Sequence, residues 1–346
     1  MFSFRPYSRR SSPLKWNAAF IAAIVLSGAM PVSVESIDAQ PDTVIERAMH
    51  TTVGILSETP AEHESGFQSR LSIRGTGVHL QAGYIVTARH AVERDQGSKR
   101  VLPKEILVLT SDLATIPAHL VGDSAYLDIV LYRIREVHRD QLETTTSFSD
   151  ANAVAGDQVF TVGYPLGWGP AVAYGRIGNP NTFLPTADTR LLQTDLSACS
   201  GNSGGGLFNG AGELVGVVHA IIKTDQGQGD QRCSRFAFAV PAILAQRIVT
   251  ALIEGKQPRF SRLGIQMTQV QVGTKWKIAA GEVSGPAKDG GVEKGDLLVA
   301  INDLDITNAA QLKNYLMERT TPGQTVTLRV LRGTQVLQLS ITLAGA

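Results

Sequence analysis

The residues with the clearest chemical potential lie at 194–207, where Ser203 stands among glycines with an apolar run on either side. Glycines around a serine remove side chains that would block a substrate, and they let the backbone turn so that several N–H groups converge on one point. Such an arrangement can stabilise an oxyanion, so the stretch predicts a nucleophilic serine. The same residues match the G-x-S-x-G pattern of α/β-hydrolases, which leaves two folds open at this point.

The order of the other polar residues along the chain separates these two folds. An α/β-hydrolase places its acid and then its histidine after the serine, but only His219 follows Ser203, and it is too close. The order His, Asp, Ser is that of double β-barrel proteases. Here His90 ends an apolar strand-like run, and Asp128 adjoins another, where a carboxylate can be partly buried to accept an imidazole N–H. The sequence therefore predicts a His90–Asp128–Ser203 triad.

Short apolar runs, separated by Gly, Asp and Pro, must position this triad. We expect strands at 71–80, 83–87, 106–110, 115–121, 129–133, 158–162, 191–194, 214–222 and 236–240. Regular short strands without alternating helices indicate a sandwich or a barrel. Three glycines and then a turn follow Ser203, whereas the serine of a hydrolase elbow opens a helix. The local sequence therefore also disfavours the hydrolase fold.

Composition allows two folded domains and excludes one class of partner. The chain has 346 residues, of which 43% are hydrophobic and 18% are charged, so apolar material suffices for two cores. The formal net charge of +1 misleads, because every charged residue before Glu35 is basic. The remainder is mildly acidic and has no basic stripe, so we expect no nucleic-acid partner.

Residues 1–34 are expected to be a signal peptide or an N-terminal membrane anchor. A basic start precedes an uncharged run from Trp16 to Val34, within which residues 27–29 are small enough for cleavage. A spanning helix needs about 20 apolar residues, and this run reaches that length if Pro31 is tolerated. Either interpretation places the body outside the cytoplasm, in the periplasm or secreted, and membrane contact is expected only if the segment is retained.

Taken together, the motifs resemble those of the HtrA (Deg) family of trypsin-like serine proteases that carry a C-terminal PDZ domain. The matching pieces, in the same order and with similar spacing, are GTGV at 75–78, TARHAV around His90, LDIVLYRI from Leu127, VGYPLG from Val162, TDLSACSGNSGGGL around Ser203 and FAVPA from Phe238. The resemblance covers nearly all of the chain after the N-terminal segment. It implies a mostly β protein, with a double β-barrel protease domain at 40–255 whose site lies between the barrels, and often a trimer.

The resemblance also assigns roles to the triad. It implies that His90 is the general base, that Asp128 orients it, and that Ser203 attacks the peptide carbonyl, with the oxyanion held by the N–H groups of Gly201 and Ser203. A serine hydroxyl is a poor nucleophile at neutral pH unless a base takes its proton. Asp123 lies close to the triad acid in the sequence, but 122–124 is expected to form a turn, so it is not the triad residue.

No metal or other cofactor is expected. The remaining histidines upstream are scattered, without the spacing of a metal site, and they are His50, His63, His79, His119 and His138. His219 lies on an apolar strand and is interpreted as a pocket-lining or satisfied core residue rather than a second base.

The residues just before the serine shape the expected specificity. Cys199 departs from the HtrA pattern and resembles secreted digestive-type trypsin-like proteases, which implies a disulfide to Cys233 at the border of the specificity pocket. The alternative is two separate buried thiols. Ser197 stands where enzymes that cut after Lys or Arg carry an acid, and His219 and Ala220 complete the expected pocket. A preference for Lys or Arg is therefore not expected, and the family resemblance implies cleavage after small or medium apolar residues.

The C-terminal part follows the PDZ pattern of the same family. An amphipathic helix is predicted at 242–255, a linker at 256–261, and a PDZ domain at 262–346. Leu263, Gly264 and Ile265 resemble the loop whose backbone N–H groups hold a chain terminus beside an open sheet edge, and a helix at 308–319 is the other wall of that groove. The alternative is a domain that only packs against the protease.

Two function classes are compatible with these features. The first is an exported serine endopeptidase that cleaves unfolded or misfolded polypeptides and binds peptide C-termini of substrates or activators at its PDZ domain. The second is a sensing or holding protein whose PDZ binding is the main activity, with little or latent proteolysis. The complete triad favours the first class, because binding alone does not require all three residues.

Overall fold

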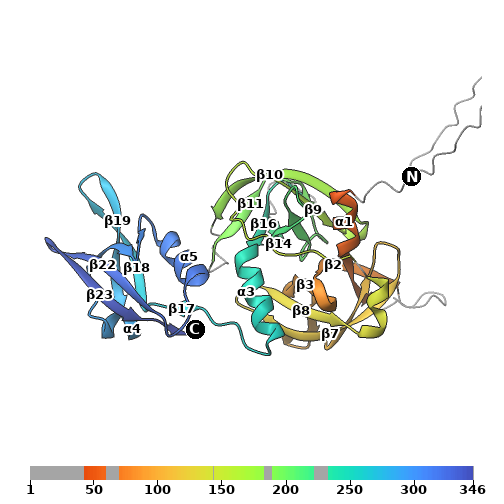
Figure 1. Ribbon diagram of the computed structural model, residues 1–346, viewed down its shortest axis with the longest axis horizontal. Coiled ribbons are helices and arrows are strands. Elements are labelled where there is room, and N and C mark those ends of the chain that lie inside the picture. Colours follow the sequence, from red (N-terminus) through yellow and green to blue (C-terminus); the bar gives the residue numbers. More distant parts are fainter. Residues whose placement is uncertain (1–42, 60–69, 143, 183–188, 222–232, 346) are drawn as a thin grey trace, which may run out of the picture. The chain divides into compact units, whose positions relative to one another are not determined.

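The computed structural model describes residues 43–59, 70–142, 144–182, 189–221 and 233–345. Strands dominate, and Figure 1 shows them forming two barrels followed by a C-terminal sheet. The predicted signal peptide or anchor at 1–34 lies outside the described residues. Among the helices of the described part, none is long and apolar enough to cross a lipid bilayer.

The first barrel is a closed ring of six antiparallel strands. In spatial order these are β1 (Thr52–Thr59), β2 (Arg70–His79), β3 (Tyr84–Ala88), β8 (Ile129–Ile134), β7 (Thr115–Ser124) and β6 (Glu105–Leu109), which returns to β1. Alternate residues along a strand face the same side, and here Val53, Ile85 and Ile116 fill the interior and are fully buried. The strands β4 (Arg94–Gln96) and β5 (Lys99–Val101) form a separate hairpin.

The second barrel also closes from six antiparallel strands. In spatial order these are β10 (Ala171–Thr182), β11 (Leu191–Thr194), β16 (Ala237–Pro241), β14 (Leu214–Ile221), β13 (Gly206–Phe208) and β9 (Gln158–Gly163). Two short strands, β12 (Ala198–Cys199) and β15 (Cys233–Ser234), pair with each other beside it. The double barrel expected from the resemblance is confirmed.

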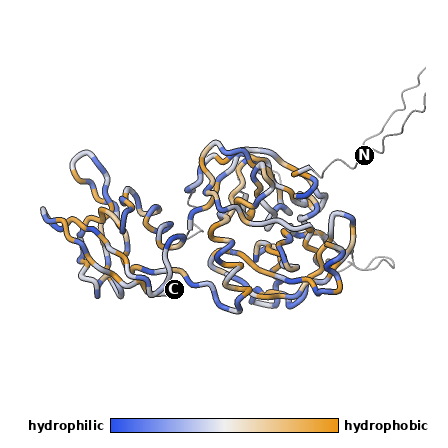
Figure 2. Tube along the Cα trace, viewed as in Figure 1, coloured by the Kyte–Doolittle hydropathy of each residue, from blue (hydrophilic) through white to orange (hydrophobic). Residues whose placement is uncertain are grey.

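One apolar cluster joins the two barrels. It contains Leu131 of the first barrel together with Phe160 and Phe208 of the second, whose rings stack with centroids 5.3 Å apart. The helix α3 (Ala242–Ile253), predicted from its amphipathic pattern, adds Ile248 to the same cluster. Figure 2 shows hydrophobic stretches along the strands of both barrels and along α3. The barrels therefore share a core, and residues at their junction are held in fixed positions.

Short helices fill the connections of the protease region. They are α1 (Val44–Thr51), α2 (Arg89–Val92) and the 3₁₀ turns η1 (Gln81–Gly83), η2 (Glu136–Gln141) and η3 (Pro165–Gly167). A capping box fixes the start of α1, because the Thr43 hydroxyl accepts from the Glu46 N–H while the Glu46 carboxylate accepts from the Thr43 N–H.

The C-terminal sheet has its own apolar core, which includes Leu298, Leu328 and Ile341. Its strands are β18 (Ile265–Val272), β19 (Lys275–Val283), β20 (Leu297–Ile301), β22 (Thr325–Arg332) and β23 (Gln335–Thr342), with β21 (Leu304–Asp305) paired to β20. Two helices, α4 (Gly285–Asp289) and α5 (Ala309–Arg319), accompany it, and β17 (Ser261–Arg262) pairs with β24 (Ala344–Gly345). Asn308 caps α5 by accepting from the Gln311 N–H.

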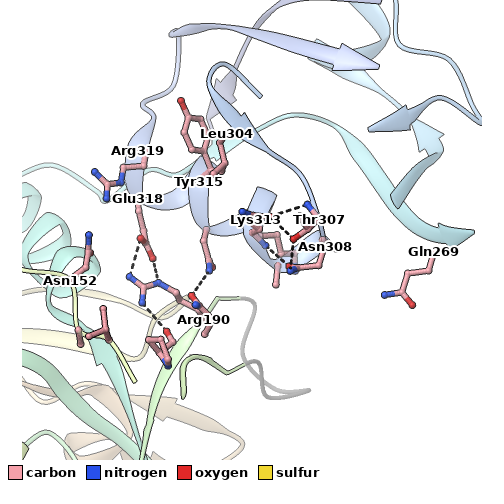
Figure 3. A pocket seen from close by; sticks show the side chains of 18 residues that line it. Asn152, Arg190, Gln269, Leu304, Thr307, Asn308, Lys313, Tyr315, Glu318 and Arg319 are labelled. Carbon is pink, nitrogen blue, oxygen red and sulfur yellow. Dashed lines mark hydrogen bonds and ion pairs between the residues drawn. The ribbon is translucent and has the colours of Figure 1, made fainter. Parts of the chain in front are cut away.

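A buried ion pair connects the strand region around β11 with α5. The Arg190 guanidinium binds both carboxylate oxygens of Glu318, one of them at 3.0 Å, and it also donates to the Pro180 carbonyl at 2.9 Å. Figure 3 shows the two side chains facing each other beside a cavity. Each side chain is only 8% exposed, so the charges are largely withdrawn from water and depend on each other.

Candidate active site

His90 and Asp128 are brought together by the pairing of β3 with β8. In this register Ala88 lies opposite Ile129 at the end of the ladder. His90 follows shortly after Ala88, on α2, and Asp128 directly precedes Ile129, so the two residues meet there. Asp128 Oδ1 accepts from the His90 backbone N–H at 2.9 Å, and Oδ2 lies 2.5 Å from His90 Nδ1. The carboxylate thus fixes both the backbone and the ring of the histidine, which leaves Nε2 as the nitrogen available for chemistry.

A second histidine binds the same carboxylate. His219, on β14 of the second barrel, has Nδ1 2.9 Å from Asp128 Oδ2. Burial by itself would raise the pKa of Asp128, but hydrogen bonds from His219 and His90, together with the charges of these rings, outweigh it and hold that pKa well below its usual range. Asp128 is therefore an anion shared between two imidazoles. Its φ of +55° is a left-handed conformation, which Asp tolerates better than most residues.

The Ser203 loop is tied to the strands that lead to His90. The Ser203 carbonyl accepts from the Thr76 N–H at 2.9 Å. At Gly204, with φ of +85°, a Cβ would lie 2.1 Å from Thr87 Oγ1, so only glycine allows this approach. A Cβ on Gly75 would contact both the Ser203 carbonyl and Ala91, which follows His90 directly. The structure therefore places Ser203 beside α2, the helix that carries His90.

The Ser203 hydroxyl makes no hydrogen bond with His90 or with any other residue that the structure describes. In proteins without a bound substrate, the hydrogen bonds of a catalytic site are often long or poorly aligned and form only when the ligand is present.

The turn before Ser203 is held by backbone contacts. The Ser200 carbonyl accepts from the Leu166 N–H at 2.6 Å. Gly201 has φ of +102°, and a Cβ there would lie 2.2 Å from the Tyr164 carbonyl, so the turn requires glycine. Within the described residues, the N–H groups of Gly201 and Ser203 donate to no acceptor. Two unpaired donors separated by one residue suit a developing oxyanion.

Thr76 holds this turn. This role was not predicted from the sequence. Its hydroxyl donates to the Gly201 carbonyl at 2.6 Å and accepts from the Tyr164 N–H at 3.0 Å. The Thr87 hydroxyl in turn donates to the Thr76 carbonyl at 2.6 Å. Thr76 is fully buried, so these bonds are shielded from water and each is costly to break. The only sequence signal was its place in the GTGV motif.

Residues upstream of the serine border the same turn. Cys199 and Cys233 form a disulfide, as expected, at the pairing of β12 with β15. Ser197 is exposed between β11 and β12. Ala220 belongs to β14, but its side chain lies outside the described part, and the His219 ring contacts Asp128 as given above. The assignment of Ser197, His219 and Ala220 to a specificity pocket stays a prediction.

The predicted carboxylate loop of the PDZ region borders a groove of about 740 Å³. Gly264 has φ of +84°, and a Cβ there would lie 2.1 Å from the Ser284 carbonyl. The N–H groups of Leu263 and Gly264 donate to no residue that the structure describes. The groove runs beside β18, starting at Ile265, and α5 lines it with residues such as Leu316. The groove combines N–H groups that have no acceptor among the described residues with apolar lining residues, which suits a chain terminus.

In the part of the chain that the structure describes, one group of histidine and acidic side chains is close enough to share a metal ion. It consists of His90, Asp128 and His219.

Comparison with known proteins agrees with this architecture. A trypsin-like peptidase domain matches residues 75–217, and a PDZ domain matches residues 261–343. The serine endoprotease DegS of Salmonella typhimurium is 27% identical over 339 residues, covering 90% of this chain and 89% of the relative. The periplasmic pH-dependent serine endoprotease DegQ of Escherichia coli is 27% identical, covering 92% of this chain and 68% of the relative.

Solved structures show the same fold. The HtrA-type protease AlgW with a tripeptide superimposes with a TM-score of 0.68 at 25% identity, covering 88% of this chain and 96% of that protein. The serine endoprotease from Yersinia pestis gives a TM-score of 0.58 at 25% identity, covering 88% and 97%. With two closed barrels, a peptidase match and a PDZ match in this order, the chain belongs to the HtrA (Deg) family of trypsin-like serine endopeptidases with one C-terminal PDZ domain.

Proposed function

We propose that the protein is an exported endopeptidase that cleaves unfolded or misfolded polypeptides with His90, Asp128 and Ser203. The observation that carries this proposal is the convergence of three features: a histidine fixed by a carboxylate, a serine on the adjoining loop, and two N–H groups beside that serine that donate to no acceptor among the described residues. An incidental serine in a glycine turn would not require the other two.

In the proposed reaction, His90 Nε2 takes the proton of Ser203 as the hydroxyl oxygen attacks the peptide carbonyl. The charge that develops on the carbonyl oxygen is received by the N–H groups of Gly201 and Ser203. His90 then gives its proton to the leaving amine, and water repeats the sequence to release the acyl group. Asp128 stays ionised and stabilises the imidazolium, which agrees with the direction of its pKa.

Cleavage of an unfolded protein tests this proposal. Casein is incubated with the full chain and with Ser203→Ala, and the new termini are sequenced. The wild-type protein is expected to produce fragments and the variant none, since the residual rate without the nucleophile lies several orders of magnitude lower. Cuts after small or medium apolar residues are expected from Ser197, and a profile dominated by cuts after Lys or Arg would overturn that part.

The PDZ groove is proposed to bind peptide C-termini of substrates or activators. The support is the pair of N–H groups at Leu263 and Gly264, which find no acceptor in the described part of the chain and lie beside an apolar groove. A peptide with a free apolar C-terminus should bind Ser203→Ala protein, whereas the same peptide with a C-terminal amide should bind much more weakly. Equal binding of both peptides would contradict carboxylate recognition. Binding without any cleavage by the wild-type protein would favour the alternative, a PDZ-based sensing or holding protein.

Export and assembly are proposed on the basis of the relatives. Relatives such as DegQ are named periplasmic, and a periplasmic location of this chain, directed by residues 1–34, is the corresponding proposal. A homotrimer is proposed from the family resemblance. Fractionation of cells into periplasm and membrane, followed by light scattering on the purified chain, measures both properties.

A further inference from the structure

Two histidines contact Asp128, but the proposed reaction uses only one of them, His90. His90 Nδ1 and His219 Nδ1 approach the same oxygen, Asp128 Oδ2, at 2.5 Å and 2.9 Å. One donor atom from each residue lies within 4.8 Å of the others. The two rings stand nearly perpendicular, with centroids 6.0 Å apart. A hydrogen-bonded His–Asp pair suffices to orient a general base, so the second imidazole is an additional feature.

The chemistry of this donor set matches a particular kind of ion. Two imidazole nitrogens and one carboxylate oxygen are preferred ligands of Zn²⁺, which also accepts a water in its fourth position. The three side chains are partly open to solvent, with exposures of 41% for His90, 19% for Asp128 and 23% for His219. An ion can therefore reach the cluster from water. The ionised carboxylate supplies negative charge that favours a cation.

We propose that His90, Asp128 and His219 bind one Zn²⁺ ion through both Nδ1 atoms and the Asp128 carboxylate, and that the bound ion reversibly inhibits the protease. The inhibitory part rests on the proposed function, because it requires His90 to be the general base. The binding part does not depend on catalysis.

Proton placement explains the inhibition. A neutral imidazole carries one proton, which lies on Nδ1 when that atom donates to Asp128. A metal on Nδ1 moves the proton to Nε2 by exchange with water, so no proton is gained or lost overall. With Nε2 protonated, His90 has no lone pair to accept the Ser203 proton. The ion also separates the Asp128 carboxylate from His90, so the carboxylate can no longer stabilise the His90 imidazolium.

The two nitrogen–oxygen separations require only a small adjustment. Tetrahedral zinc with bonds of about 2.0 to 2.1 Å separates its ligand atoms by roughly 3.3 Å. The present separations of 2.5 Å and 2.9 Å are hydrogen-bond distances, so each ring must retreat by less than about 1 Å. His219 alone adds the second nitrogen, and without it the site would keep one imidazole and one carboxylate. His219 is therefore the residue that makes the cluster a zinc site.

Direct binding is measured on the full-length Ser203→Ala protein, which cannot digest itself. Calorimetric titration with ZnCl₂ is expected to show one ion per chain, and Co²⁺ as a probe should give the visible absorption of a four-coordinate site. Adding His219→Asn should weaken zinc binding on the order of 10- to 100-fold or more, because a ligand is lost. The substitution His138→Asn, at a half-buried histidine of η2 outside the cluster, is the matched control and should leave binding unchanged.

Inhibition is measured on the active protein with a chelator as reference. Each variant is compared with its own activity in excess EDTA, so a change in basal rate does not affect the comparison. Zinc should inhibit the wild-type and His138→Asn proteins reversibly, whereas His219→Asn should need at least about tenfold more zinc for the same inhibition. Equal zinc sensitivity of His219→Asn would refute the proposal.

The two measurements separate the possible failures. If the chain cleaves nothing but zinc binds Ser203→Ala protein through His219, the proposed function fails and the metal site stands. If the protein is an active protease but binds no zinc, or binds it equally with and without His219, the metal site is refuted and the proposed function stands. Unfolding curves of each variant without metal show whether a loss of binding is due to misfolding. If His219→Asn misfolds, the Co²⁺ spectrum of the Ser203→Ala protein, which keeps His219, decides.

Discussion

The substitution Thr76→Val tests how the oxyanion turn is held. It removes one hydroxyl while keeping nearly the same shape. Two buried groups then lose their partners: the Gly201 carbonyl, now bonded at 2.6 Å, and the Tyr164 N–H, now bonded at 3.0 Å. Leaving a buried polar group unsatisfied costs about 1 to 3 kcal/mol, so the two together amount to about 2 to 6 kcal/mol.

Only part of that cost should appear in catalysis. The cost of the unsatisfied Gly201 carbonyl, about 1 to 3 kcal/mol, falls on the turn that positions the Gly201 and Ser203 N–H groups. It corresponds to about a 5- to 150-fold loss in the population of the turn conformation that can bind the oxyanion. We expect kcat to fall by this factor with little change in KM, because these N–H groups act on the transition state more than on the bound substrate. The Tyr164 share should appear as lost folding stability.

The matched control is Thr76→Ser, which keeps the hydroxyl and loses only a methyl group. Initial rates on a fluorogenic peptide that spans a mapped cleavage site give kcat and KM for each protein, and urea unfolding gives stability. The control should keep kcat within about threefold of the wild type, at a stability cost of about 1 kcal/mol for the lost methyl. A Val variant with kcat within twofold of the wild type, or a Ser variant as slow as the Val variant, would show that the hydroxyl does not hold the turn.

Three further predictions concern stability. Burial lowers the pKa of His79 below its usual value of 6.5, so the unfolded chain takes up the proton first and the wild-type protein loses stability as the pH falls below 6.5. His79→Gln should lose less between pH 8 and pH 5.5 in urea unfolding, and parallel curves would contradict this. Replacing Cys199 and Cys233 together by Ser opens a loop with a sequence separation of 34 and should cost about 3 to 4 kcal/mol in the chain-entropy model, whereas an unchanged urea midpoint would argue against it. Glu318→Gln leaves the buried Arg190 charge uncompensated and should cost about 3 kcal/mol; adding Arg190→Met should recover part of that loss, and additive losses would disagree with a coupled pair.

Much of the fold was predictable from local patterns. The strands that flank the site were readable as short apolar runs, because nearly every residue of β3, β8 and β9 is buried, and α3 shows a helical period. The long strand β10 was not predicted, because most of its residues are exposed or half-buried and it contains Gly175, Gly178 and Pro180. A strand that is mostly exposed leaves no apolar run in the sequence.

The site itself depended on contacts that a sequence does not show. The triad order and its glycine turn were readable, but Thr76 and Gly201 are 125 residues apart, and no local pattern indicates their bond. Asp123 was wrongly predicted to lie in a turn. It belongs to β7, pairs with Val130 and accepts from Arg89 Nε at 2.8 Å, because a register shift lets the strand continue past Gly122.

His219 shows the same limit most clearly. Its position on an apolar strand of the second barrel was evident, but alternation gives only the face on which a side chain lies. The neighbour across the junction of the barrels, Asp128, follows from how the two barrels pack. The contact that distinguishes this site therefore required the structure.

Activation of Ser203 by His90 is the step on which the proposed mechanism depends most. Reaction with a fluorophosphonate tests it without knowledge of the natural substrate, since the reagent phosphonylates an activated serine. We expect peptide mapping by mass spectrometry to find one modified residue, Ser203, in the wild-type protein, and a rate reduced by several orders of magnitude in folded His90→Ala protein. Labelling of another serine, or equal labelling of Ser203 in both proteins, would contradict the mechanism.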